Sequence, residues 1–400
     1  MNKKVIFKAM CACALSLSAA ITATAAQLPD DKLTVDTALQ NLATRLLQGK
    51  QGSIVAIEPQ TGRVLALVSR DKVDDGINRA IGMTYSPGST FKTAQTLEMV
   101  SEGTLTAKTT YPCQKGFYYN KVRIGCHAHP SPLSLVQAIG QSCNSYFCKA
   151  FQEMVDNREA YPSQFVAMNR WHDYMRSFGL GAPLGIDLEG EVGGTIPNAA
   201  WLNAHHPRWN GTTIMWMGMG QGEVTTTPLQ LCNLAALIAN RGWYITPHVH
   251  EVSQVKASTE SALPTSIDST YLRRHYSLAT KEAIDLVVKG MRACVINGTA
   301  ASINRTDYAI CGKTGTAENE GHDHSAFMGF APMNDPKVAV SVYVENGGFG
   351  ADLAAPLAAI IMEQAVNGKL SAASRQKARR WADKNVKITP VEREISFDDL

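Results

Sequence analysis

Ser86-Pro87-Gly88-Ser89-Thr90-Phe91-Lys92 joins a turn to the predicted start of a helix. Proline and glycine end the preceding segment, and residues 89–100 have the pattern of a helix that begins at the serine. Lys92 lies three residues after Ser89, so both side chains share a face, where a serine and a neutral lysine can act as nucleophile and base. The alternative is a capping serine followed by a solvated lysine. Because the pattern is common by chance, it favours that alternative when taken alone.

The composition is that of a globular protein, with 45% hydrophobic and 18% charged residues among 400. This length fits one large catalytic domain as well as several smaller domains. The net charge of +3 comes from 38 basic and 35 acidic residues. So balanced a charge does not indicate a nucleic-acid partner, and we expect none.

The first 26 residues have the features of a secretory signal peptide. A basic start with Lys3, Lys4 and Lys8 precedes an apolar run over residues 9–20, and Ala23-Thr24-Ala25 fits a cleavage site. The alternative is an uncleaved membrane anchor, but the run is short and rich in alanine, serine and threonine. We therefore expect an exported, periplasmic protein, which stays at the cytoplasmic membrane if the segment is retained.

Strand patterns lie at both ends of the remaining chain, and helix patterns lie between them. A helical segment over residues 27–48 precedes two apolar runs, 53–57 and 63–68, joined by a Pro/Gly turn as in a hairpin. Residues 100–230 are mostly helix and loop, with one helix expected over 174–185, and a further helix is expected over 281–295. Further β-rich runs are 308–317, 326–331 and 338–344, followed by a helix over 351–366 and a charged tail over 371–400. This order predicts an α/β (α+β) fold, with a mostly antiparallel sheet flanked by helices beside an all-α lobe.

Two further motifs carry groups suited to catalysis. Ser142-Cys143-Asn144 precedes a predicted helix, so its hydroxyl can relay a proton and its amide can hold a substrate carbonyl. Lys313-Thr314-Gly315-Thr316 lies in a predicted strand, where the glycine permits another backbone to approach closely. Taken alone, the first motif could equally be a polar loop that caps a helix, and the second could be an exposed edge strand.

Ser-x-x-Lys, Ser-x-Asn and Lys-Thr-Gly occur here in the order typical of penicillin-binding proteins and serine β-lactamases. The chain resembles the transpeptidase domain of an elongation-type class B penicillin-binding protein, over about residues 40 to 370. Further matching stretches are 78–80, 218–222, 227–230, 312–318, 327–332 and 345–348. We expect the domain itself over 49–370. The membrane anchor and large N-terminal pedestal usual in class B proteins are not evident, and the segment before Asn78 is short.

The resemblance implies an acyl-transfer mechanism. Ser89 would attack the carbonyl between the two terminal D-alanines of a peptidoglycan stem peptide while Lys92 takes its proton. Ser142 and Lys313 would pass a proton to the departing D-alanine. An amine of a neighbouring stem peptide would then resolve the acyl-enzyme, whereas a β-lactam would acylate Ser89 and stay.

The resemblance also implies the substrate-binding residues and partners. Asn144 would hold the substrate amide, Thr314 and Thr316 would bind its carboxylate beside Gly315, and N–H groups of Ser89 and Thr316 would form an oxyanion hole. Expected partners are stem peptides, β-lactams and a glycosyltransferase of the elongation machinery. The alternatives are a serine β-lactamase, a D,D-carboxypeptidase, or a non-catalytic β-lactam sensor or scaffold of wall synthesis.

A cluster of cysteine and histidine residues precedes and enters the second motif. Cys126-x-x-His129 has metal-ligand spacing, and Cys113 and Cys143 would complete a tetrahedral structural zinc site. Some elongation-type relatives bind zinc here, which implies these four ligands, with His127 as the competing imidazole. The alternative is a Cys113–Cys126 disulfide in an oxidising compartment. The chemistry itself is expected to need no cofactor.

Overall fold

The computed structural model describes residues 33–389, apart from residues 73, 120–121, 253–269 and 320. The predicted signal peptide over residues 1–26 therefore lies outside the described residues, as does most of the loop before residue 275. Within the described part of the chain, no helix is both long and apolar enough to cross a membrane.

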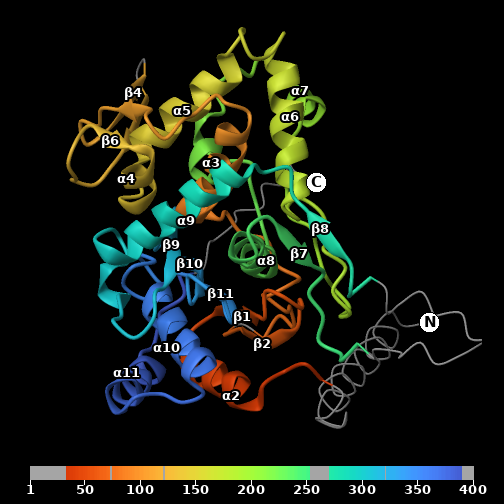
Figure 1. Ribbon diagram of the computed structural model, residues 1–400, viewed down its shortest axis with the longest axis vertical. Coiled ribbons are helices and arrows are strands. Elements are labelled where there is room, and N and C mark those ends of the chain that lie inside the picture. The colour runs from red at the N-terminus through yellow and green to blue at the C-terminus, as the bar shows by residue number, and fades with distance from the viewer. Residues whose placement is uncertain (1–32, 73, 120–121, 253–269, 320, 390–400) are drawn as a thin grey trace, which may run out of the picture.

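A five-stranded antiparallel sheet joins the two ends of the chain (Figure 1). Its order is β2-β1-β11-β10-β9, so the N-terminal hairpin pairs with the C-terminal strands. The strands are β1 (Gly52–Ile57), β2 (Val64–Arg70), β9 (Cys311–Ala317), β10 (His324–Ala331) and β11 (Val338–Val344). β9 lies at one edge, which leaves one side of this strand free to pair with an extended peptide.

Helices cover both faces of this sheet. α8 (Pro228–Ala239) packs on β1, β10 and β11, while α10 (Ala354–Asn367) packs on β10 and β11 from the other side, next to α2 (Thr37–Leu46). The alternating valines of 338–344 predict one apolar face, yet all seven residues of β11 are buried. The second face is buried because α8 packs on it, and the hydroxyl of Ser341 on that face donates to the carbonyl oxygen of Pro228.

A second lobe, mostly helical, is formed by the middle of the chain. Its main helices are α3 (Lys92–Ser101), α4 (Leu135–Gly140), α5 (Asn144–Asp156), α6 (Gln164–Ser177), α7 (Ala199–His205) and α9 (Lys281–Ile296). α3 is its central helix, buried at nine of ten positions and packed against α5, α6 and α9. The fold class is confirmed, but the lobe is not purely helical.

Short β pairs and single helical turns complete the lobe. The pairs are β3 (Thr110–Tyr111) with β6 (Leu133–Ser134), β4 (Gly116–Tyr119) with β5 (Val122–Gly125), and β7 (Trp243–Ile245) with β8 (Arg274–Tyr276). The turns are η2 (Gly88–Phe91), η3 (Met215–Met219) and η4 (Ala301–Ile303). The short strands were not predicted, because runs of two to four residues carry too little periodicity to stand out.

Capping side chains account for several of the helix starts. Ser163 accepts the N–H of Val166, so α6 begins at Gln164, ten residues before the start expected from the sequence. Thr227 and Gln230 form a capping box with Pro228 at the first position of α8. Ser89 lies on the 3-10 turn η2, and the α-helix itself begins at Lys92.

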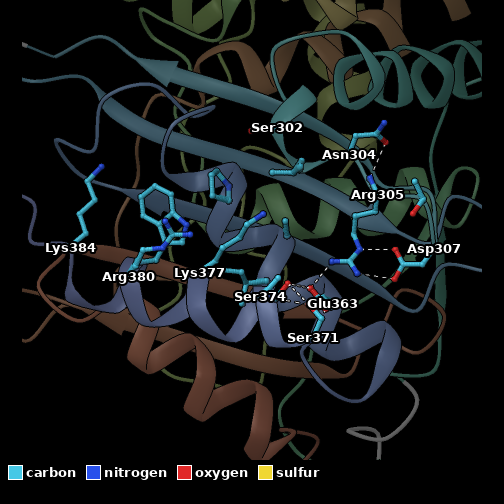
Figure 2. A pocket seen from close by; sticks show the side chains of 17 residues that line it. Ser302, Asn304, Arg305, Asp307, Glu363, Ser371, Ser374, Lys377, Arg380 and Lys384 are labelled. Carbon is cyan, nitrogen blue, oxygen red and sulfur yellow. Dashed lines mark hydrogen bonds and ion pairs between the residues drawn. The ribbon is translucent and has the colours of Figure 1, made fainter.

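The charged segment after residue 371 contains a helix, α11 (Ala372–Asp383), which packs on α2 and α10. A cavity opens between α10, α11 and the loop around Arg305 (Figure 2).

Candidate active site

The Ser89 turn is pressed against the edge strand β9, and two glycines permit the contact. Gly88 has φ +54°, and a Cβ atom there would lie 2.6 Å from the carbonyl oxygen of Thr316. A Cβ atom on Gly315 would lie 2.9 Å from the carbonyl oxygen of Pro87. Ser89 is half-buried in this contact. The backbone of the turn and the backbone of β9 therefore form two walls of one site.

Lys92 is fully buried beneath the Ser89 turn. Its Nζ donates to Asn144 Oδ1 at 2.6 Å and to the carbonyl oxygen of Ser142 at 2.8 Å, and it lies 3.4 Å from Ser142 Oγ. Burial lowers the pKa of this lysine to about 8, because the ammonium form loses its hydration. A substantial fraction is therefore neutral near physiological pH and able to accept a proton.

Ser142 connects two buried lysines. Lys313, also fully buried, donates from Nζ to Ser142 Oγ at 2.7 Å and to the carbonyl oxygen of Thr314 at 2.9 Å. Burial lowers the pKa of Lys313 to about 7, with a further lowering from the nearby charge of Lys92. Ser142 itself has φ +55°. One hydroxyl between two amines of low pKa forms a short path for proton transfer.

Asn144 starts α5 and holds Lys92 in place. Besides accepting from Lys92, its side chain donates to the carbonyl oxygen of Gly125 at 2.9 Å, and its backbone N–H lies 3.4 Å from Cys126 Sγ. The amide is thus fixed by contacts on both ends. These contacts show a role in orienting the lysine that the sequence did not reveal.

The hydroxyl of Thr314 in the Lys-Thr-Gly-Thr strand lies beside a third threonine, Thr299. Thr314 Oγ1 and Thr299 Oγ1 are 2.5 Å apart, and the carbonyl oxygen of Thr316 accepts a hydrogen bond from Gln221 Nε2 at 3.4 Å. Thr299 follows α9, and no sequence motif pointed to it. Gln221 lies within the stretch 218–222, whose resemblance to the family was the only signal for it.

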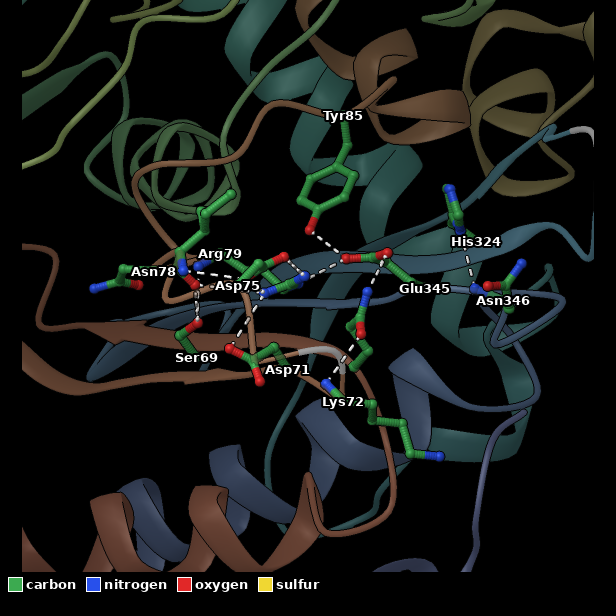
Figure 3. A network of polar contacts seen from close by, with 12 residues as sticks. Ser69, Asp71, Lys72, Asp75, Asn78, Arg79, Tyr85, His324, Glu345 and Asn346 are labelled. Atoms are coloured by element: carbon green, nitrogen blue, oxygen red, sulfur yellow. Dashed lines mark hydrogen bonds and ion pairs between the residues drawn. The ribbon is translucent and has the colours of Figure 1, made fainter. Parts of the chain in front are cut away.

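A buried arginine fastens the segment that leads to Ser89 (Figure 3). The Arg79 side chain is 2% exposed and makes a two-pronged contact with Asp75, at 2.6 and 2.9 Å. Its Nε donates to Glu345 at 3.0 Å, and the Tyr85 hydroxyl donates to the same carboxylate oxygen at 2.7 Å. Tyr85 also stacks on Tyr343 with ring centroids 4.2 Å apart. This network ties residues 75–85 to the end of β11.

The cysteine and histidine cluster comes together beside Asn144. Ligand atoms of Cys113, Cys126, His129 and Cys143 all lie within 4.8 Å of one another. His129 Nδ1 is 2.7 Å from the carbonyl oxygen of Pro130, so its Nε2, 3.4 Å from Cys126 Sγ, is the nitrogen that faces the cluster. His127 is not in this group. All four cysteines of the region, Cys148 included, are unpaired thiols.

This set of donors fits zinc. Three thiolates and one imidazole are a common structural zinc set, and tetrahedral ligands at about 2.0–2.3 Å from the metal fit in a cluster of this size. A Cys113–Cys126 disulfide is not formed. Because Cys143 lies between Ser142 and Asn144, an ion bound here would brace the wall of the site.

Comparison with known proteins gives consistent results. The family model "Penicillin binding protein transpeptidase domain" matches residues 52–363. Peptidoglycan D,D-transpeptidase MrdA of Acinetobacter baumannii is 31% identical over 372 residues, which cover 81% of this chain and 52% of that protein. The MrdA of Haemophilus influenzae is 30% identical, over 84% of this chain and 56% of that protein. The chain thus spans about half the length of these relatives.

Solved structures resemble the fold as well. Penicillin-binding protein PBP2 of Pseudomonas aeruginosa, in complex with WCK 5153, has a TM-score of 0.70 and 29% identity, covering 85% of this chain and 77% of that one. PBP2 of Helicobacter pylori in complex with MreC has a TM-score of 0.68 and 25% identity, covering 84% of this chain and 64% of that one.

Proposed function

Because this chain belongs to the penicillin-binding protein transpeptidase family, we propose that it crosslinks peptidoglycan stem peptides through an acyl-enzyme on Ser89. One observation carries the proposal. The hydroxyl of Ser142 lies between two buried lysines of lowered pKa, Lys92 and Lys313, beneath a serine turn that packs on an open strand edge. That arrangement supplies a nucleophile, a base and a proton path next to a surface for an extended peptide.

In the acylation step, Ser89 Oγ attacks the carbonyl carbon between the two D-alanines, and neutral Lys92 accepts the hydroxyl proton. The negative oxygen that forms would lie between the backbone N–H groups of Ser89 and Thr316, which the close contact of η2 with β9 brings near each other. When the C–N bond breaks, the proton reaches the leaving amine through Ser142. The products are free D-alanine and an ester on Ser89.

Substrate binding follows from the free edge of β9. An extended stem peptide would pair with this edge, and its terminal carboxylate would meet the hydroxyls of Thr314 and Thr316 near Lys313. Thr299 would orient Thr314 through their 2.5 Å contact. Asn144 would hold Lys92 and face the substrate amide. The ester is then resolved by the amine of a second stem peptide, which forms the crosslink.

The name of these relatives, peptidoglycan D,D-transpeptidase, supports this reaction over a β-lactamase, a D,D-carboxypeptidase or a non-catalytic sensor. The deciding experiment combines a fluorescent penicillin with intact-mass spectrometry. We expect one penicilloyl adduct that persists through a long incubation, and none in Ser89→Ala. Rapid loss of the adduct with turnover of penicillin would instead identify a β-lactamase.

An acyl-D-Ala-D-Ala donor separates the two peptidase reactions. With an added amine acceptor, a transpeptidase makes the transfer product in preference to the free acid, whereas a carboxypeptidase releases D-alanine and the free acid regardless of the acceptor. Failure of Ser89 to acylate with either donor, in a folded protein, would contradict the proposal as a whole.

The pH dependence of acylation should follow the protonation of Lys92. Burial lowers the pKa of this lysine to about 8, and only its neutral form accepts the Ser89 proton. The acylation rate constant should therefore be level above about pH 8 and fall toward tenfold per pH unit well below it. Stopped-flow acylation across this range measures it, with circular dichroism to show that the protein stays folded. A rate that rises as the pH is lowered would contradict this role.

We also propose that Cys113, Cys126, His129 and Cys143 hold a structural zinc ion. The ion would join the segments that carry these four residues and would take no part in the reaction. Support comes from the preformed cluster and the fixed His129 ring. The thiol of Cys126 lies at the N–H of Asn144, so the cluster is joined to the residue that orients Lys92.

Replacing Cys126 with serine should lower bound zinc at least about tenfold and reduce the melting temperature, because one of four ligands is lost. His127→Ala is the matched control, since this neighbouring imidazole lies outside the group and should leave the metal content unchanged. Inductively coupled plasma mass spectrometry and thermal melts measure both. Zinc retained by Cys126→Ser would contradict this ligand set. Zinc lost from His127→Ala would show that His127 is a ligand.

The cellular setting is part of the same proposal. The signal-like first 26 residues support export to the periplasm. Two similar solved structures are described as a peptidoglycan synthase complex that coordinates polymerization and crosslinking, and as a PBP2–MreC complex. The first of them supports a polymerising partner, which we propose is a glycosyltransferase of the elongation machinery. Co-purification with a tagged elongation glycosyltransferase tests it.

A further inference from the structure

A cavity of about 780 Å³ lies between η4, α10 and α11, and it shares no residue with the site described above (Figure 2). Its volume falls in the range of sites that hold a small molecule or a few residues of a peptide. Apolar side chains of η4 and α10 line part of it, including Ile303, Ala359 and Ile360. Neither the acyl-transfer chemistry nor the cysteine cluster uses this region.

The charged side chains of the inner wall of the cavity are paired with one another. Arg305 donates from Nε and Nη2 to the two oxygens of Asp307, each at 2.8 Å, and from Nη1 to Glu363 at 2.5 Å. Glu363 also accepts the backbone N–H of Ser371 and the hydroxyl of Ser374. These groups hold the wall together, so they offer no unpaired charge to an incoming ligand.

The rim, in contrast, is positively charged and unpaired. Lys377 and Arg380 of α11, and Lys384 directly after it, are exposed at the mouth of the cavity, and among the described residues none of the three has an ion-pair partner. Trp381 lies among them, with the Lys384 Nζ 5.1 Å from its ring centroid. Tryptophan and arginine are the side chains most often found at the energetic centre of protein interfaces.

Positive charge is concentrated in the segment that forms the rim. Residues 369–387 contain seven basic residues and one acidic residue, a net charge of +6, while the chain as a whole carries +3. The rest of the protein is therefore slightly acidic. A patch of opposite sign to its surroundings favours one acidic partner in one orientation.

We propose that this cavity, with the rim of α11, is a docking site for an acidic peptide segment of a partner protein. An apolar side chain of the segment enters the hollow against Trp381, and flanking carboxylates pair with Lys377, Arg380 and Lys384. The hollow shape with apolar lining favours a protruding side chain over a flat lipid surface. This site is independent of the proposed crosslinking reaction.

The probe is a fluorescein-labelled synthetic peptide with a central leucine-phenylalanine pair flanked by aspartates, and fluorescence anisotropy with the full chain measures its binding. The triple variant Lys377→Glu, Arg380→Glu, Lys384→Glu should weaken binding by about tenfold or more. The matched control is Lys369→Glu, Arg379→Glu, Lys387→Glu, which changes the net charge equally at exposed positions outside the cavity. We expect the control to bind within about twofold of the parent.

Equal weakening in both triple variants would overturn the proposal, because it would show only general attraction to a basic surface. No binding by the parent chain would also overturn it. Sedimentation with phosphatidylglycerol vesicles tests the membrane alternative: vesicle binding that only the rim variant loses, without peptide binding, would assign the site to lipid. Penicillin labelling should be equal in all variants, which shows that each is folded.

Discussion

Replacing Lys92 with methionine should slow the acylation of Ser89 by penicillin by about 10³-fold or more, at the upper end of what loss of a general base costs. Methionine keeps the length and apolar body of the side chain, but it cannot accept the Ser89 proton. The change also removes the donor to Asn144 Oδ1 and to the Ser142 carbonyl oxygen. Stopped-flow measurement of the second-order acylation constant tests this prediction.

Lys92→Arg is the informative control. Arginine keeps the positive charge and the hydrogen bonds, yet it stays protonated at every accessible pH and cannot serve as a base. It should therefore be almost as slow as the methionine variant. If Lys92→Arg acylates at a rate close to the parent, the lysine acts through its charge alone, and the proton of Ser89 must leave by another group such as Ser142.

Replacing Arg79 with methionine should lower the free energy of unfolding by about 3–5 kcal/mol. The substitution leaves the carboxylates of Asp75 and Glu345 without the buried cation that pairs with both, and Glu345 is only 15% exposed. Because Tyr85 donates to the same Glu345, we also expect slower acylation through a less ordered Ser89 turn. Urea unfolding followed by circular dichroism measures the stability.

A double-mutant cycle with Glu345→Gln isolates the pair. The doubly substituted protein should be less destabilised than the sum of the single variants, because the uncharged amide no longer needs the arginine, with a coupling of about 0.5–3 kcal/mol. Arg79→Lys should recover only part of the stability, since lysine cannot make the two-pronged contact with Asp75. Strictly additive effects would show that the contact seen between the two side chains carries no energy.

Local features of the fold followed from local patterns in the sequence. The strand over 338–344 has the bounds that its alternating valines predicted, and α9 begins at Lys281 as expected. Both depend on periodicity within one element, which a single sequence displays directly. The start of α6 was missed because its cap at Ser163 precedes a segment with weak apolar periodicity.

In the candidate site, too, some features follow from the local sequence and others depend on tertiary packing. Ser89 and Lys92 are one helical turn apart, so their proximity is a property of four consecutive residues. The resemblance to the family added Ser142, Asn144 and Lys313 as expectations, but it could not show that one hydroxyl lies between both amines. Lys313 Nζ donates to Ser142 Oγ although the two residues are 171 positions apart in the chain, so this contact depends on how the turn before α5 lies against β9.

The sequence by itself therefore determined the order of the elements, the three-residue spacing of Ser89 and Lys92, and the cysteine and histidine spacing. Only the tertiary structure decided that both lysines are buried, that His129 rather than His127 joins the cluster, and that Arg79 meets Glu345. The reason is physical: desolvation, which moves a lysine pKa toward neutrality, is a property of everything packed around the side chain. Elements that are distant in the chain supply that surrounding, and no local pattern records it.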